Sequence, residues 1–308
     1  MDRSGVQQVV TFSNSMTFDC LITNPPFSIN KELNRNSQYY YMQFLNLYVK
    51  VVKNTIWILP ESWYYNNVIF ETSRQTLYGK LVSLRLVRVP EWQNIDAKYV
   101  WIFKTGDSST VHFKVPEYET TILQDLFWNR ILPKYKDIYD WLQTPFQCPL
   151  CGQKHNHIEK RCDGLYFDEY VLSSNLFNIK TNSDLESNNV QSNNIQVITN
   201  RGLKFTSINR IPKHARKYVD KWKIVTKYTT DENIEFKLIE PGKVVSESFL
   251  VVYTTDTQGD AFETIGYLNR PFVKKIINSI RYNRHVTRTS FYYVPKKQWS
   301  ILTRTTQP

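Results

Sequence analysis

Apolar residues near the start of the chain form two short continuous runs, at 20–22 and 56–59. Runs of this kind are typical of strands that are buried on both faces of a sheet. Between them, aromatic and aliphatic side chains recur every three or four residues over 38–53, which predicts an amphipathic helix. Proline stops both runs, first at Pro25 and then at Pro60, because it can neither donate to a strand ladder nor continue a helix.

The residues that follow continue this alternation of strands and helices. We expect a second helix over 66–80 and a pair of antiparallel strands at 84–89 and 99–103. A third helix is predicted over 119–131, where apolar residues recur at helical spacing. The order strand, helix, strand, helix, hairpin over 18–115 indicates the α/β class.

The pattern changes in the second half of the chain. A stretch rich in Asn and Ser at 173–196 predicts a loop with little to bury. Beyond it we expect a strand at 243–254 and a helix with one apolar face at 269–282. The sequence therefore predicts an α/β domain over 1–117 and an α+β domain over 118–308.

Composition narrows the class of partner. The 308 residues carry a net charge of +11 and 15% of them are aromatic, which favours a polyanion and most simply nucleic acid. The sequence contains no run of eighteen apolar residues and no charged-then-apolar leader, so we expect no membrane association. Four cysteines in a chain of this length do not make a disulfide scaffold, and we expect a cytoplasmic protein.

The candidate catalytic residues follow the first apolar run, at Asn24-Pro25-Pro26-Phe27. A polar amide stands there at the carboxyl end of a predicted strand, which is where open α/β sheets bind ligands. The simplest interpretation is an Asx-Pro turn. The four residues also resemble motif IV of the S-adenosylmethionine-dependent amino methyltransferases, and the strand before them and the aromatic ring within them favour that resemblance.

The resemblance implies a role for these residues. The side-chain oxygen of Asn24 and the carbonyl of Pro25 would accept hydrogen bonds from an exocyclic amino group and aim its lone pair at the methyl sulfonium. Pro25 and Pro26 would hold the amide rigidly. Phe27 would stack on a base that has been extruded from the duplex. By the same resemblance, residues 60–63 would line the pocket for that base.

A glycine-rich cofactor turn is missing from the sequence. The nine glycines include no pair spaced as G-x-G, although the methyltransferase fold normally places a glycine-rich turn after its first strand. Binding of S-adenosylmethionine would therefore need a cofactor-binding half from upstream sequence or from a second chain. Without that half, the strand at 20–22 would leave an exposed apolar edge that seeks a partner, unless residues 6–12 cover it.

A cluster of potential metal ligands lies at 148–162. C-x-x-C followed by glycine is the usual turn that presents two thiolates to zinc, and two histidines and a third cysteine follow it. A redox C-x-x-C would need a strand-then-helix context that is absent here, and reduced thiols without a metal are a further alternative. Tetrahedral zinc needs four ligands. The predicted structural-zinc set is Cys148, Cys151, His157 and Cys162, and His155 is the alternative to His157.

Basic residues interleaved with aromatic ones dominate 201–228, and more follow the helix expected at 269–282. This is the composition of a surface that contacts phosphates. A solvated helix face is the alternative, but such faces usually mix both signs of charge. The predicted DNA-contacting residues are Arg201, Lys204, Arg210, Lys213, Arg216, Lys217, Lys221, Lys223, Lys274, Arg284 and Arg288.

Residues 243–295 resemble the C-terminal part of the target-recognition region in adenine methyltransferases of type II restriction–modification systems. In that family a similar helix precedes the pattern found here between His285 and Pro295. The two resemblances together imply a partial Rossmann-like methyltransferase sheet, an α+β target-recognition domain, and methyl transfer to adenine N6 in double-stranded DNA. A catalytically inactive DNA-recognition subunit and a protein glutamine methyltransferase are the alternatives.

Overall fold

In the computed structural model the chain folds into two compact units, Met1–Lys136 and Asp137–Pro308, and each is described by itself. The first unit continues past the boundary expected at 117 because the strand that follows still belongs to its sheet. The structure describes residues 18–25, 40–60, 63–64, 73–88, 99–129, 131–159, 162–180, 194–281 and 284–299.

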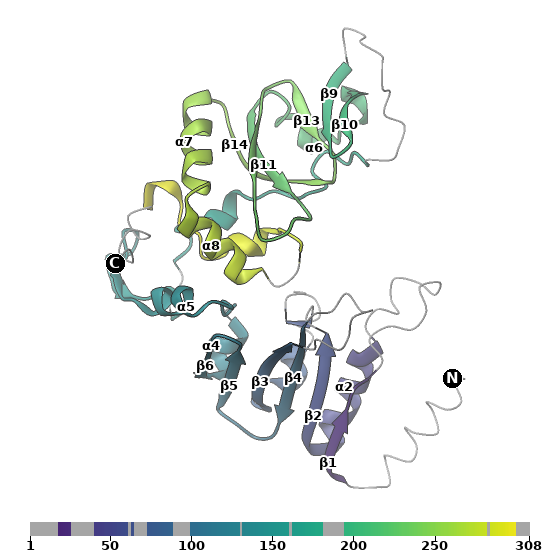
Figure 1. The fold of residues 1–308 in the computed structure, drawn as a ribbon, viewed down its shortest axis with the longest axis vertical. Helices are drawn as coiled ribbons and strands as arrows, with labels where there is room; N and C mark the ends of the chain where they lie inside the picture. The colour runs from purple at the N-terminus through teal and green to yellow at the C-terminus, as the bar shows by residue number, and fades with distance from the viewer. Residues whose placement is uncertain are drawn as a thin grey trace, which may run out of the picture. The chain divides into compact units, whose positions relative to one another are not determined.

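A six-stranded mixed sheet forms the first unit (Figure 1). Its elements are β1 Phe18–Thr23, α2 Tyr40–Val51, β2 Val52–Pro60, β3 Leu81–Arg88, β4 Tyr99–Thr105, β5 Thr110–Val115, β6 Tyr118–Leu123 and α4 Gln124–Asn129. The strands lie in the order β1-β2-β4-β3-β5-β6, so β4 inserts between the two strands that precede it in the chain. β1 and β2 are parallel, whereas β4 is antiparallel to both of its neighbours.

The periodicity of the sequence predicts most of these elements. The helix expected over 38–53 and the strand expected at 56–59 are confirmed as α2 and β2, and the expected antiparallel pair is β3–β4. Within the helix expected over 66–80, residues 73–77 are helical. The strand proposed at 6–12 lies outside the described residues.

The helix predicted over 119–131 is wrong in its first half. Residues 118–123 form β6, which pairs with β5 across a two-residue turn. Along β6 the buried and exposed positions alternate, with Tyr118 and Ile122 inward, and this period of two is that of a strand. Helix α4 begins only at Gln124. A short strand followed at once by a short helix mimics a single helix in an apolar pattern.

Aromatic side chains build the interior of the first unit. Trp57 on β2 and Phe103 on β4 are stacked with ring centroids 5.9 Å apart, and Trp63 stacks on the same Phe103 at 5.5 Å. The indole Nε1 of Trp57 donates to Oγ1 of Thr55 at 2.6 Å, which satisfies its one polar group. β2 and β4 are therefore joined by stacked aromatic rings as well as by their ladder, and β1 pairs with β2.

β1 is an exposed edge strand, as expected for a chain without a cofactor-binding half, although its apolar run is typical of a strand buried on both faces. It lies at one edge of the sheet, and within the described residues β2 is its only partner strand. Ile22 is 72% exposed, and Cys20 is exposed as well. An apolar edge strand of this kind presents unpaired backbone groups to which another strand can add.

The second unit combines three small sheets with helices over its described residues. The sheets have the orders β7-β8, β10-β9-β13 and β12-β11-β14. The elements are α5 Lys136–Gln143, β7 Phe146–Gln147, β8 Lys154–His155, η3 Phe167–Tyr170, β9 Asn194–Thr199, β10 Gly202–Ser207, η4 Ile208–Arg210, α6 Lys213–Arg216, β11 Trp222–Lys227, β12 Phe236–Ile239, β13 Lys243–Val245, β14 Phe249–Thr255, α7 Gln258–Leu268, α8 Pro271–Ile280 and η5 Arg288–Phe291.

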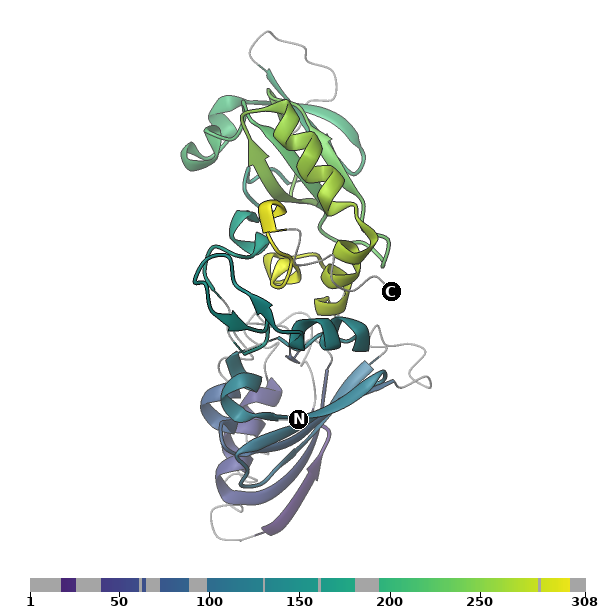
Figure 2. The same cartoon turned by 90° about the vertical axis from the view of Figure 1, so that its left-hand side faces the viewer.

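Two of the predicted elements can be followed directly in this unit. The helix expected over 269–282 is confirmed as α8. The single strand expected at 243–254 is instead two strands in different sheets, β13 and β14, because the chain turns at 246–248. Figure 2 shows α7 lying across the β12-β11-β14 sheet, against which it packs. Among the described residues, no helix has the length and apolar character needed to cross a membrane.

Candidate functional site

The candidate acceptor site begins where β1 ends. Because β1 and β2 are parallel, with Thr23 opposite Trp57, their carboxyl ends lie at the same edge of the sheet. Asn24 follows β1 and is exposed, whereas Pro25 beside it is buried. A buried proline limits the backbone torsion next to the amide. The arrangement therefore places Asn24, whose side-chain oxygen can accept hydrogen bonds, on this edge of the sheet.

The structure describes only some of the other residues in the two predicted motif segments, 24–27 and 60–63. Pro26 and Phe27 lie outside the described residues. In the segment 60–63, Trp63 is fully buried, and its Nε1 donates to Oγ of Ser73 at 2.9 Å. The indole of Trp63 therefore belongs to the interior of the unit and does not line a base pocket.

Three cysteines and one histidine converge in the second unit. One ligand atom from each of Cys148, Cys151, His155 and Cys162 lies within 4.8 Å of the others. The β7–β8 pair brings them together, because Cys148 follows β7 directly and His155 ends β8. Cys148 is buried and Cys151 is exposed, and all three cysteines are free thiols. The C-x-x-C spacing and the third cysteine were sufficient to predict three of these four residues.

His157, the histidine placed in the predicted ligand set, lies outside this cluster. Its Nδ1 is 2.7 Å from the hydroxyl of Tyr166, and its ring stacks on Phe146 with centroids 4.4 Å apart. Burial lowers the pKa of His157 to about 3, so the ring is neutral at pH 7. The alternative histidine, His155, occupies the fourth place. Spacing alone could not separate the two, because each follows the C-x-x-C turn within a few residues.

The thiols of the cluster differ in acidity. The backbone N–H of Gln153 lowers the pKa of Cys151 to about 6. Burial raises the pKa of Cys162, and the neighbouring thiols raise it further. A backbone donor aimed at a sulfur atom stabilises the thiolate, which is the form that binds metals.

The predicted DNA-contacting residues differ in how freely they reach solvent. Arg201, in the turn between β9 and β10, is exposed, and so are Lys213 and Lys217, which begin and follow α6. Lys213 and Lys217 are four positions apart, so they lie on one side of that helical turn. Also exposed are Arg210, Arg284 and Arg288, whereas Lys204, Arg216, Lys221 and Lys274 are half-buried.

Several of these cations already have partners within the protein. The guanidinium of Arg216 donates to the carbonyl of Ile211 at 3.1 Å. Nζ of Lys221 lies 2.9 Å from the carboxylate of Asp256. These contacts reduce the charge that Arg216 and Lys221 can offer to a phosphate, so exposed cations such as Arg201, Lys213 and Lys217 are the stronger candidates.

Lys223 is buried, which corrects its assignment as a DNA-contacting residue. Its side chain is fully enclosed, and Nζ donates to the carbonyl oxygens of Tyr218 at 3.0 Å, Val219 at 2.8 Å and Lys221 at 2.5 Å. Burial lowers the pKa of Lys223 to about 8. These carbonyls follow α6, so the ammonium closes the turn that leads into β11. Charge counting along the sequence could not distinguish this internal role.

Replacing Lys223 should therefore lower stability instead of weakening DNA contacts. Lys223→Met removes one donor from each of three carbonyls, of which those of Tyr218 and Val219 keep a backbone donor, and we expect a loss of about 1–3 kcal/mol in the free energy of unfolding. The matched control is Lys217→Met, at an exposed position, which should change it by less than about 0.5 kcal/mol. Denaturant unfolding measures both. Equal stability of the two variants would contradict the internal role.

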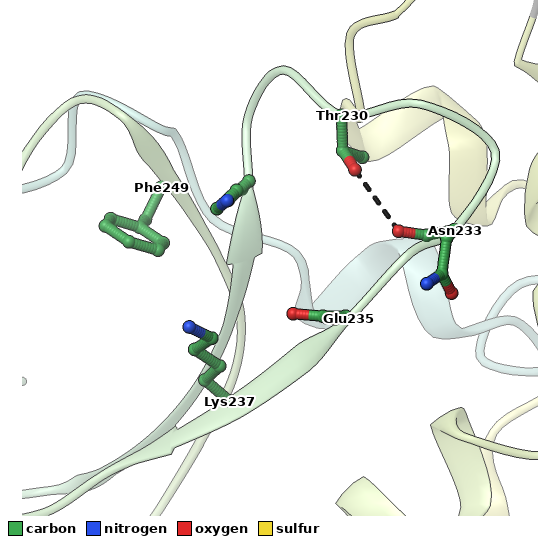
Figure 3. Close-up of a pocket in the computed structure, with 6 residues that line it drawn as sticks. Thr230, Asn233, Glu235, Lys237 and Phe249 are labelled. Carbon is green, nitrogen blue, oxygen red and sulfur yellow. Dashed lines mark hydrogen bonds between the residues drawn. The ribbon is translucent and has the colours of Figure 1, made fainter. Parts of the chain in front are cut away.

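The β12-β11-β14 sheet borders a small polar cavity that the sequence did not predict. It has a volume of about 120 Å³ and is lined by Lys227, Thr230, Asn233, Glu235, Lys237 and Phe249 (Figure 3). Oγ1 of Thr230 donates to the backbone carbonyl of Asn233 at 3.2 Å, which closes the loop between β11 and β12. Two lysines against one glutamate give the cavity a net positive charge. Lys237 was missed because it stands alone on β12, outside the basic stretch of the sequence.

Comparisons with known proteins give structural likeness only. No protein-family model and no curated protein matches the sequence. Among solved structures, the chain is similar to the type IIL restriction-modification enzyme MmeI in complex with DNA, at 10% identity and a TM-score of 0.42, over 89% of this chain and 46% of that one. It is also similar to the type IIG restriction endonuclease BpuSI, at 11% identity and a TM-score of 0.30, over 82% and 41% of the two chains.

A further similarity is to the M protein of the type I restriction enzyme EcoKI (EC 2.1.1.72), at 13% identity and a TM-score of 0.27. That match covers 56% of this chain and 39% of the other. The chain thus spans less than half the length of each of these restriction–modification proteins.

Proposed function

We propose that this chain is the base-acceptor and target-recognition part of a DNA adenine-N6 methyltransferase of the restriction–modification kind. The observation that carries the proposal is the exposed amide of Asn24, which follows β1 beside the buried Pro25, at the edge where parallel β2 also ends. This is the edge at which open α/β sheets hold their ligands. S-adenosylmethionine would supply the methyl group, and we assign no residue of this chain to its binding because the sequence has no G-x-G turn.

Asn24 and Pro25 would orient the acceptor. Oδ1 of Asn24 and the carbonyl oxygen of Pro25 would each accept a hydrogen bond from the N6 amino group of adenine. As the nitrogen forms its bond to the methyl carbon, the bond from that carbon to the sulfonium sulfur would break and S-adenosylhomocysteine would leave. The nitrogen would gain positive charge, which both oxygens would stabilise until the amino proton is lost to solvent. Phe27 would stack on the extruded base, because a base inside the duplex is out of reach.

The second unit would supply contacts to the DNA backbone. Arg201, Lys213 and Lys217 are exposed on it, and the cavity that includes Lys227 and Lys237 adds positive charge. Such residues bind phosphates of any sequence and set the register of the protein on the duplex. Base readout would come from other parts of 118–308, which we propose as the target-recognition domain.

Residues 1–117 would be the second half of a Rossmann-like methyltransferase sheet. The proposed cofactor-binding half, from further sequence or from a second chain, would add a strand to the exposed edge of β1. Cys20 and Ile22 on that edge are exposed, and such a strand would cover them.

The 308-residue chain by itself should bind S-adenosylmethionine far more weakly than micromolar, because no glycine turn is available to approach the cofactor. Isothermal titration calorimetry measures this directly. A low-micromolar dissociation constant for the isolated chain would show that the cofactor site is complete.

Two other functions carry observations of their own. A recognition subunit without catalysis is favoured by the missing glycine turn together with the positive surface. A protein glutamine methyltransferase would also place an amide acceptor after a strand, but it has no use for a positively charged recognition domain. An assay of methyl transfer distinguishes the proposed DNA methyltransferase from these two alternatives.

The test uses the complete enzyme, obtained by co-expressing the chain with the reading frames that adjoin it in its own locus. Labelled S-adenosylmethionine is offered with duplex DNA or with a glutamine-containing peptide. We expect label in the duplex and none in the peptide. Label in the peptide alone would favour the glutamine methyltransferase, and duplex binding without any transfer would favour the recognition subunit.

A further inference from the structure

We propose that Cys148, Cys151, His155 and Cys162 bind one zinc ion in a closed structural site. The four residues lie on the β7–β8 pair and the segment after it, within the second unit. The site is independent of methyl transfer, so the proposal stands or falls separately from the proposed function.

Three of the distances between the ligand atoms are close to those of a zinc tetrahedron, and the four atoms all lie within 4.8 Å of one another. Zinc bonds of about 2.3 Å to sulfur and about 2.0 Å to nitrogen place two sulfurs about 3.8 Å apart and a sulfur and a nitrogen about 3.5 Å apart. The two Sγ atoms of Cys151 and Cys162 are 3.6 Å apart. Nε2 of His155 lies 3.6 Å from Sγ of Cys151 and 3.4 Å from Sγ of Cys162. These three edges fit one ion at their common centre.

The ring of His155 is oriented for this role. Nδ1 lies 3.2 Å from the carbonyl oxygen of Asn156, so Nδ1 carries the hydrogen and Nε2 directs its lone pair at the cysteines. A second hydrogen bond of this kind is the usual companion of a metal-bound histidine. His157 is not part of the cluster: its buried ring stacks on Phe146 and its Nδ1 lies 2.7 Å from the hydroxyl of Tyr166.

The backbone of the C-x-x-C turn is hydrogen-bonded in a reversal that can bring two thiols to one ion. The N–H of Gly152 donates to the carbonyl of Cys148 at 2.9 Å, and the N–H of Cys148 donates to the carbonyl of Gln153 at 3.0 Å. Gly152 has φ +68°, a conformation that other residues rarely adopt, and this lets the chain reverse between the two thiols. Four protein ligands leave no open position, which is the mark of a structural zinc site rather than a catalytic one.

The site would also hold the C-terminal segment of the second unit. The loop that carries Cys162 leads directly into Leu165 and Tyr166. The carbonyl of Leu165 accepts from the N–H of Lys296 at 2.9 Å, and Tyr166 forms a β-bridge with Pro295. Fixing Cys162 through the metal therefore fixes the strand-like segment to which residues 294–296 attach.

The first experiment uses the unmodified chain. Elemental analysis of protein purified without chelator should find one zinc per chain. In a thiol-modification time course, Cys20 is exposed and outside the site, so it should react at once. Cys148, Cys151 and Cys162 should react only after a chelator is added. Absence of zinc, or fast reaction of the exposed Cys151 before chelator, would overturn the proposal.

A pair of histidine variants then tests the ligand set. His155→Ala should lower zinc affinity by on the order of 10–100-fold or more, whereas His157→Ala should keep the metal and lose stability instead. Cobalt substitution gives a readout without activity, because a tetrahedral site with three thiolates has intense visible bands. Loss of those bands in His157→Ala with retention in His155→Ala would exchange the roles of the two residues and contradict the assignment.

Discussion

Asn24→Ala should reduce methyl transfer to duplex DNA by about 10²–10³-fold in the complete enzyme. The amide oxygen stabilises charge that develops on the amino nitrogen only during the reaction, so its loss falls on the rate of the chemical step. Duplex affinity should stay nearly unchanged, since one exposed neutral side chain contributes little to a binding surface dominated by charge. Single-turnover transfer from labelled cofactor measures the rate, and fluorescence anisotropy measures the binding.

The matched control is Asn54→Ala. Asn54 is also an exposed asparagine of the first unit, on β2 beside β1, and its side-chain amide donates to the carbonyl of Asp19 at 3.5 Å. Asn54→Ala should therefore transfer at close to the normal rate. Near-normal transfer by Asn24→Ala would mean that residues 24–25 are only a proline turn after an edge strand.

Neutralising Arg201, Lys213 and Lys217 together should weaken duplex binding and flatten its dependence on salt. Each phosphate contact contributes a slope of about −0.9 in log affinity against log salt concentration, so three glutamine substitutions should lower the slope by about 2.7. The three side chains are exposed, so their replacement should leave the fold intact. Anisotropy titrations across a series of salt concentrations provide the slope.

Lys243→Gln is the control for this experiment. Lys243 is a lysine of the same unit, but its Nζ lies 2.6 Å from the carboxylate of Glu240, so its charge is already balanced. Its replacement should change the slope by much less than one unit. An unchanged slope in the triple variant would place the DNA surface elsewhere on the molecule.

The sequence predicted the elements whose local pattern agrees with their packing. α2 and α8 each have one apolar face, and each buries that face, so the period of 3.6 was a sufficient signal. β6 was misjudged because apolar residues of a strand and of α4 run together without a separating glycine or proline. Which neighbours a strand acquires cannot be read from its own residues, and this is why the apolar run of β1 is typical of a buried strand although β1 lies at an edge of the sheet.

The candidate sites show the same division between local and distant information. The C-x-x-C turn is a local structure, so its two cysteines and Gly152 were evident from the sequence. The choice of His155 over His157 depends on how the two rings pack, because the ring of His157 lies against Phe146 and Tyr166 and away from the cysteines. Lys223 looked like one more surface cation; its carbonyl partners are local, but its complete burial was not evident from its own segment. Tertiary packing decides such cases.

The most direct measurement is the identity of the methylated base. A host that lacks adenine methylation of its own receives the chain together with its neighbouring reading frames, and the host DNA is digested to nucleosides and analysed by mass spectrometry. The proposed function predicts N6-methyladenine in DNA from cells with the wild-type chain and its near-absence with Asn24→Ala. DNA without N6-methyladenine in both, or with equal amounts in both, would contradict it.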